Sequence, residues 1–140
     1  MIKFVNAAEV KNVADNFDEV WYISSTMKKA PSEKIKHVPE LAPKTSANEG
    51  NFEAAFLTQM RQKTSMQKLN ELYALGKKKN VLCVCYKNDC AHKNIVCGLL
   101  QGAYKSRNES VVDADTDYSS FFTTYNKLRV VTPQKELAIA

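Results

Sequence analysis

The chain has 140 residues, of which 44% are hydrophobic and 25% are charged, and it carries a formal net charge of +5. This length and composition fit one soluble globular domain, which can bury enough apolar surface to fold without disulfides or structural metals. No apolar run is long enough to cross a bilayer, and the N-terminal MIKFVNAAEV lacks the apolar core of a signal peptide. We therefore expect no membrane partner.

The first elements predicted are a strand, a helix and a second strand. Residues 2–5 are typical of a short strand, and Asn6 and Glu9 have the spacing of a capping box, which begins a helix. The segment EVWYISS, which begins at Glu19, is rich in aromatic and branched residues and predicts the second strand. The helix between them places four apolar side chains on one face: Val10, Val13, Ala14 and Phe17.

Residues 25–50 differ in composition from the rest of the chain. They contain Pro31, Pro39 and Pro43 together with lysines and small polar residues, so a long helix does not fit them. A loop of this length is uncommon in a compact domain unless it serves a function. We expect a lid or an interaction surface here, in which Lys28 and Lys29 close over a ligand.

The middle of the chain predicts helices around one strongly apolar strand. Residues 51–62 and 65–79 have the apolar spacing of two helices, and Gly76 is a stop signal for the second. NVLCVCY (80–86) is apolar without alternation, which is typical of a strand covered on both faces. Residues 92–104 predict a further helix. Beyond it, SVVDADTDY and LRVVTP each predict a strand, whereas SSFFTTYNKL is ambiguous and QKELAIA is not placed.

This alternation of strands and helices indicates the fold class. It predicts an α/β fold, with a single domain over residues 1–140, a mostly parallel central sheet and helices on both faces. Few catalytic signatures accompany it. The glycines are isolated, so no Gly-rich phosphate loop is present, and a histidine-based triad has only His37 and His92 to draw on.

All four cysteines lie close together: Cys83, Cys85, Cys90 and Cys97. A disulfide scaffold spreads its cysteines along the chain, so this clustering argues against one and favours a cytoplasmic location. In a strand, Cys83 and Cys85 are about 6.5–7 Å apart, whereas two thiolates on one zinc ion lie about 3.8 Å apart. We therefore expect Cys83, Cys85 and Cys97 to be buried apolar residues, and we expect no metal site.

The residues that follow the apolar strand form the candidate site. In open parallel sheets ligands bind at the carboxyl ends of strands, and the N-terminus of a helix attracts anions. A cysteine there gains thiolate character and a histidine can act as acid or base, so Cys90 and His92 are the candidate catalytic residues. In the alternative interpretation, Asn88 or Asp89 caps the helix and His92 is merely exposed. The expected anion-binding set is Tyr86, Cys90, His92, Lys93, Lys28 and Lys29.

The segment VLCVCYKNDCAHKNIVCGLL (81–100) resembles the signature of the bacterial and archaeal domain of unknown function 488 family. In that family an apolar strand ends near a Cys-Tyr pair and Cys-His-Arg opens the next helix, so His92 and Lys93 take the His-Arg positions. The resemblance is clearest over residues 69–100 and implies a compact α/β fold with a pocket beside the strand end. It implies no particular reaction. Ala91 stands where the family has cysteine, and Lys93 stands where it has arginine.

The charged residues do not add a cofactor site. Lysine is the main basic residue, and arginine, which specific phosphate and base recognition favours, occurs only three times, so a solvated lysine-rich surface is the favoured interpretation. The acidic segment fails as a calcium loop, because the positions that need glycine and glutamate hold Tyr118 and Thr124. It is interpreted instead as a solvated turn that contains Asp113, Asp115 and Asp117. We expect no cofactor.

Two hypotheses of function follow. The first is a small cytoplasmic protein that binds an anionic ligand, phosphate-bearing or nucleic acid, at the end of strand 81–86, with enzymatic activity undecided. The second is a non-enzymatic interaction module, for example a phage or mobile-element protein that binds and modulates a host protein. The strand-end position of Cys90 and His92 favours the first hypothesis, whereas the altered Cys-His-Arg motif and the loop at 25–50 favour the second.

Overall fold

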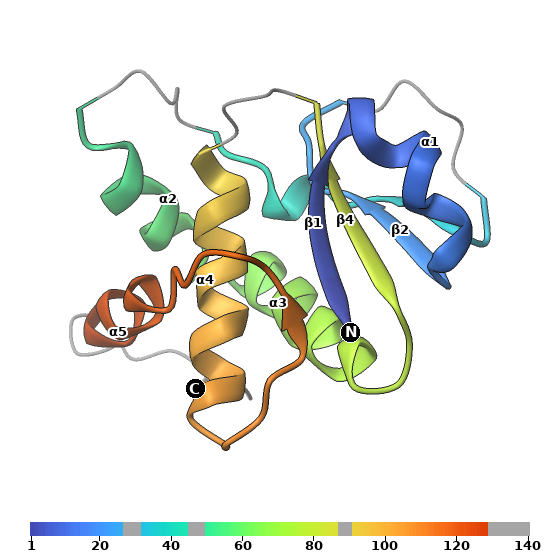
Figure 1. Ribbon diagram of the computed structural model, residues 1–140. Helices are drawn as coiled ribbons and strands as arrows, with labels where there is room; N and C mark the ends of the chain where they lie inside the picture. The colour runs from blue at the N-terminus through green and yellow to red at the C-terminus, as the bar shows by residue number, and fades with distance from the viewer. Residues whose placement is uncertain (27–31, 45–49, 87–90, 129–140) are drawn as a thin grey trace.

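The computed structural model describes residues 1–26, 32–44, 50–86 and 91–128. Its strands form one five-stranded sheet in the order β3-β2-β4-β1-β5, and every pair of neighbours is parallel. The strands are β1 (Ile2–Asn6), β2 (Glu19–Tyr22), β3 (Ile35–His37), β4 (Val81–Cys85) and β5 (Val112–Asp113). The helices are α1 (Val10–Val13), α2 (Phe52–Gln59), α3 (Lys63–Gly76), α4 (Ala91–Lys105) and α5 (Ser120–Lys127). The predicted α/β class with a parallel sheet is confirmed (Figure 1).

Strand β4 is the centre of the sheet because it pairs with β1 on one side and β2 on the other. All of its residues are buried, as the unbroken apolar run predicts for a strand covered on both faces. Its side chains alternate between two cores. Val81 and Cys83 belong to one, and Leu82 and Val84 belong to the other.

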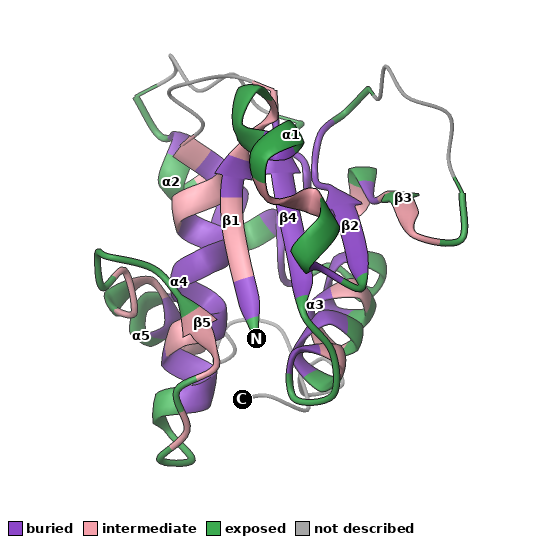
Figure 2. Cartoon of the chain, turned by 45° about the vertical axis from the view of Figure 1, so that its right-hand side comes forward, coloured by how far each residue is buried: buried purple, intermediate pink, exposed green. Residues whose placement is uncertain are grey.

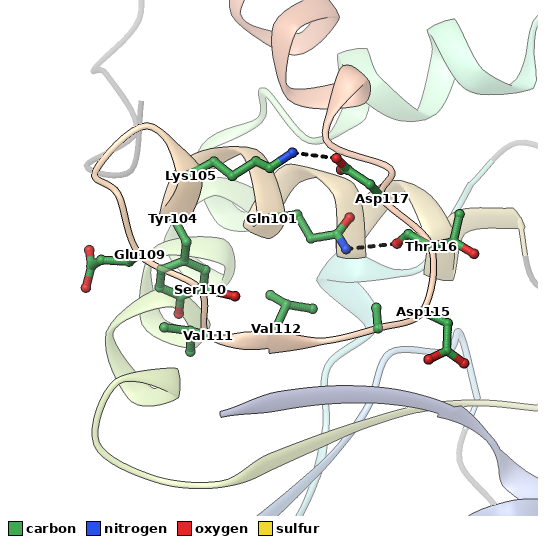
Figure 3. A pocket seen from close by; sticks show the side chains of 11 residues that line it. Gln101, Tyr104, Lys105, Glu109, Ser110, Val111, Val112, Asp115, Thr116 and Asp117 are labelled. Carbon is green, nitrogen blue, oxygen red and sulfur yellow. Dashed lines mark hydrogen bonds and ion pairs between the residues drawn. The ribbon is translucent and has the colours of Figure 1, made fainter.

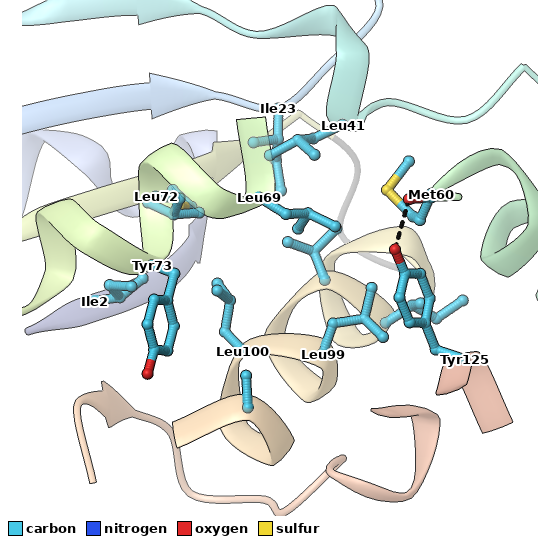
Figure 4. Packing of buried hydrophobic residues seen from close by; sticks show 14 of the residues in the cluster. Ile2, Ile23, Leu41, Met60, Leu69, Leu72, Tyr73, Leu99, Leu100 and Tyr125 are labelled. Carbon is cyan, nitrogen blue, oxygen red and sulfur yellow. Dashed lines mark hydrogen bonds between the residues drawn. The ribbon is translucent and has the colours of Figure 1, made fainter. Parts of the chain in front are cut away.

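The two faces of the sheet are covered unequally (Figure 2). The smaller core lies under α1 and its flanking 3-10 turns, Ala7–Glu9 and Ala14–Asn16, and includes the predicted apolar face through Val10 and Phe17. The larger core lies on the opposite face, where α2, α3, α4 and α5 contribute residues such as Leu69, Leu99 and Tyr125 (Figure 4). In this core the Tyr125 hydroxyl donates a hydrogen bond to the carbonyl oxygen of Met60, at 2.9 Å.

Three segments differ from their predictions or lie outside the described residues. The loop at 25–50 contains β3 and a 3-10 turn, Pro39–Leu41, in addition to loop structure. SSFFTTYNKL, which was ambiguous from sequence, forms α5. The strand predicted at LRVVTP lies almost entirely beyond Leu128, outside the described residues.

The strand order places a topological switch point between β1 and β4. The chain that leaves β1 enters α1 and the smaller core, whereas α4, which follows β4, contributes Ile95 and Leu99 to the larger core on the opposite face. Two neighbouring parallel strands whose connections leave in opposite directions have a crevice between their carboxyl ends, and this crevice is where open α/β sheets bind ligands. The candidate site must therefore be sought beside Asn6 and Cys85, the paired last residues of β1 and β4.

Candidate functional site

The first turn of α4 lies near these carboxyl ends of the strands. Two adjacent side chains of this turn, His92 and Lys93, point in different directions. His92 is buried, with its Nε2 atom 2.7 Å from the carbonyl oxygen of Ile23 and its ring edge-on to Phe56. Because a carbonyl oxygen only accepts, Nε2 must carry the hydrogen. His92 therefore ties the start of α4 to the end of β2 within the larger core. The alternative interpretation, in which His92 is exposed, is therefore wrong on this point.

Lys93 points to the other side, toward β1. Its ammonium group donates a hydrogen bond to the side-chain oxygen of Asn6, at 3.2 Å. The side chain is half-buried, and the contact joins the first turn of α4 to the last residue of β1. The dipole of a helix is positive at this end, so the helix and the lysine both favour an anion here. Lys93 thus places a cation at the switch point.

Tyr86 lies on the α1 side of the sheet edge. Its ring packs on Tyr22 with 5.6 Å between the ring centroids, and it covers part of the smaller core. Burial, and then the neighbouring Tyr86, raise the pKa of Tyr22, so its phenol is neutral near pH 7. Tyr86 and His92 are therefore on opposite faces of the sheet. Of the other predicted site residues, Cys90, Lys28 and Lys29 lie outside the described residues.

A cavity of about 320 Å³ opens beside Lys93, and we name it the strand-end cavity. Residues 3–5 of β1 form one wall, Lys93, Asn94 and Cys97 of α4 form another, and the segment after β5 closes the third side. Glu9, from the turn after β1, also lines it. This volume is at the low end of the range of about 300–1,000 Å³ that small-molecule sites occupy. The cavity is thus large enough for a small metabolite.

The segment after β5 separates this cavity from a second one, of about 290 Å³, that lies along the later turns of α4. Gln101 holds the segment by donating from its amide nitrogen to the Thr116 carbonyl oxygen and by accepting from the Tyr118 amide, at 2.9 and 2.8 Å. Lys105 forms an ion pair with Asp117 (Figure 3). These contacts fix the wall that both cavities share.

Sequence reasoning did not assign Lys3, Glu9 or Asp115 to the site. Lys3 and Glu9 come from the first nine residues, and Asp115, which was interpreted as part of a solvated turn, follows β5. They meet at α4 only because β5 lies next to β1, a pairing between distant parts of the sequence. The right-handed crossover that is usual between parallel strands can place β5 beside β1 by way of α4, but no local sequence motif predicts this placement.

The described cysteines are buried. Cys83 and Cys97 are free thiols, as predicted. Cys85 is buried, as predicted, but it takes part in a disulfide, so the expectation of a free cysteine is wrong for Cys85. Burial raises the pKa of both free thiols. For Cys97 the result is about 12, because the lowering effect of Lys93 is smaller than the effect of burial and Asp117 raises the value further. Neither free thiol is therefore a nucleophile at neutral pH.

Within the described residues, no three histidine, cysteine or acidic side chains come together to hold a metal ion. Asp113 and Asp117 of the acidic segment lie instead beside Lys3 and Lys105. In the same part of the chain, no helix is long and apolar enough to cross a membrane.

Comparison with family models, with curated proteins and with solved structures finds no match to this chain. The resemblance to the domain of unknown function 488 family stays a prediction. Its motif lies at the edge of the sheet where Lys93 and the strand-end cavity are found. Any function proposed for the chain therefore rests on the geometry of this edge.

Proposed function

We propose that the protein binds a small phosphate- or carboxylate-bearing ligand in the strand-end cavity, with Lys93 as the anchoring cation. The observation that carries this proposal is the contact between Lys93 and Asn6. It holds an ammonium group at the carboxyl end of β1, which pairs with β4, and beside a cavity. Ligands of parallel sheets bind at such strand ends. The cytoplasmic location stays a prediction, and the disulfide at Cys85 argues against it, because disulfides are rare in cytosolic proteins.

Other features support a small anion rather than a nucleic acid. Several lysines away from the strand-end cavity form ion pairs. Lys36 and Lys79 pair with Glu19, and Lys77 pairs with Glu109. Nucleic-acid sites instead present several cations in a row to the phosphate backbone. Two lysines line the strand-end cavity, but Lys3 pairs with Asp113, so among the described residues Lys93 is the one without an ion-pair partner. One such lysine matches one phosphate or carboxylate group.

The test is a titration of the ¹⁵N-labelled protein with inorganic phosphate, followed by NMR at low ionic strength. Lys93→Met keeps the length of the side chain and removes its charge. Since a charge-assisted hydrogen bond is worth about 1.5–3 kcal/mol and this site is only half-buried, we expect about a 10-fold loss of affinity. The largest changes in amide chemical shift should occur in residues 93–97 and in β1.

Lys78→Met is the matched control, because Lys78 is exposed in the turn before β4, at the opposite edge of the sheet. Its phosphate affinity should equal that of the wild type. If Lys93→Met and Lys78→Met lose the same phosphate affinity, binding depends only on the net charge of the protein, and the proposal fails. Absence of any localised binding would also reject it and would favour the interaction-module hypothesis.

A further inference from the structure

The charges around the strand-end cavity do not suit a ligand that is only anionic. Two lysines, Lys3 and Lys93, and three carboxylates, Glu9, Asp113 and Asp115, line it. Lys3 and Asp113 lie 3.8 Å apart and largely compensate each other. The charges that remain are one ammonium group on α4 and two carboxylates, Glu9 from the turn after β1 and Asp115 from the segment after β5.

Those three charges have no ion-pair partner among the described residues. Lys93 donates to a neutral amide, and Glu9 accepts a hydrogen bond from the Asn6 backbone N–H at 3.2 Å. Asp115 is turned away from Lys105, which binds Asp117 instead (Figure 3). A ligand that enters the cavity therefore meets a cation and two carboxylates whose charges the described residues leave uncompensated.

The rest of the cavity lining, which we call the cavity floor, is neutral. Cys97 is only 3% exposed, lines the cavity and has no hydrogen-bond partner among the described residues. It lies one turn after Lys93, on the same side of α4, and its thiol is protonated at neutral pH. Phe4 and Val5 of β1 also line the cavity. This floor fits the short carbon skeleton that joins two charged groups.

We propose that the ligand is a small zwitterion, which carries one phosphate or carboxylate group for Lys93 and one amino group for Asp115 and Glu9. This inference rests on the proposed function, because it takes Lys93 as the anion anchor. Charges of both signs around one cavity add specificity, since an anion without the amino group places its charge near two uncompensated carboxylates. Phosphorylated amines and amino acids are the classes of compound that fit.

The experiment compares two probes that differ in one group, 2-aminoethyl phosphate and ethyl phosphate, by NMR titration of the full chain. The wild type should bind the amino compound about 5- to 10-fold more tightly, which corresponds to a partly exposed ion pair of about 1 kcal/mol or slightly more. Asp115→Asn should abolish most of this preference by weakening the amino compound alone. Asp15→Asn, an exposed change outside the cavity, should leave the preference intact.

The outcomes separate the two proposals. If the wild type binds both probes equally and Lys93→Met weakens both, the zwitterion inference fails while the anion site stands. A preference that persists in Asp115→Asn also overturns the inference. If neither probe binds, or if Lys93→Met has no effect on either, both proposals fail. High salt should reduce the preference, because the groups involved are partly exposed.

Discussion

The backbone of Gly98 in α4 lies against the carbonyl group of Tyr118, so closely that a methyl group at position 98 has no room. Gly102, one turn later, lies in the same way against the side chain of Phe122. α5 therefore packs on a face of α4 that these two glycines leave bare. This contact positions the segment that forms one wall of both cavities.

Gly98→Ala should destabilise the protein by about 1–3 kcal/mol, because the new methyl group meets backbone, which cannot move aside as a flexible side chain would. Alanine favours an isolated helix over glycine by about 1 kcal/mol, so a net loss identifies the packing conflict as the cause. Urea unfolding measures the change. Gly50→Ala is the control, since among the described residues no atom lies within 4 Å of the position that its new methyl group would take. An unchanged or higher stability of Gly98→Ala would contradict the α4–α5 packing.

Glu19 should make folding sensitive to acid. Burial by itself would raise the pKa of this carboxyl, but hydrogen bonds from Lys36, Trp21 and Lys79 lower it to about 2. A depressed pKa stabilises the fold above the ordinary value near 4.3, and this stabilisation is lost as the pH falls toward 2. Glu19→Gln should therefore lower the free energy of unfolding by about 1–3 kcal/mol at pH 6, less at pH 3.

Urea unfolding of the wild type and Glu19→Gln at pH 6, 4 and 3 checks this expectation. The exposed pair Lys68–Glu71 provides the control, and Glu71→Gln should cost no more than about 0.5 kcal/mol at any pH. If the difference in free energy of unfolding between the wild type and Glu19→Gln stays constant from pH 6 to 3, the charge of the carboxylate does not contribute to stability.

His92 should act on stability rather than on the ligand. Replacement by leucine leaves the carbonyl oxygen of the fully buried Ile23 without its donor and should cost about 1–3 kcal/mol. His92→Gln retains an N–H donor and should recover part of that loss. Unfolding by urea ranks the three proteins. In the His92→Gln protein the phosphate affinity should stay within about twofold of the wild type, and a loss as large as that of Lys93→Met would place His92 in the binding site.

The free thiols should react slowly in the native protein. Burial raises the pKa of Cys97 to about 12 and that of Cys83 still more, so almost none of either thiol is ionised at a pH of about 7.5. Iodoacetamide at that pH, with peptide mass spectrometry, should find both cysteines unmodified in the folded protein and both modified in urea. Rapid native labelling of Cys97 would show that the cavity floor is more open and more polar than its burial indicates.

The core elements of the fold could be predicted from sequence because each carries its own pattern. The run VLCVC is apolar on both faces, and it became the central strand whose side chains alternate between two cores. β3 could not be found in this way, because it has three residues and lies at the edge of the sheet, where pairing with β2 alone defines it. α5 was ambiguous because its serines and threonines are weak helix formers, and packing of Phe122 and Tyr125 on α4 decides its structure.

The candidate site could be predicted only in part. The motif after β4 pointed to the first turn of α4, where Lys93 and the strand-end cavity are found. The reason is that strand ends and helix starts bind anions in parallel folds. The motif could not tell His92 from Lys93, because neighbouring helix residues point about 100° apart and the packing of α4 decides which one faces the core. Glu9 and Asp115 follow β1 and β5, so their meeting at the cavity depends on strand order rather than on any motif.

The order of the strands also bears on when the chain can fold as it is synthesised. β1 is the first strand to be made, yet its partners are β4 and β5, so Ile2 pairs with Val81 and Val112. Until those late segments leave the ribosome, only β2 and β3 have a strand partner among the described residues already made. Such distant pairings require the closure of long loops, which slows folding. A nascent chain that ends before β4 should therefore remain sensitive to protease. β1, the first strand to be synthesised, is among the last to pair with its neighbours.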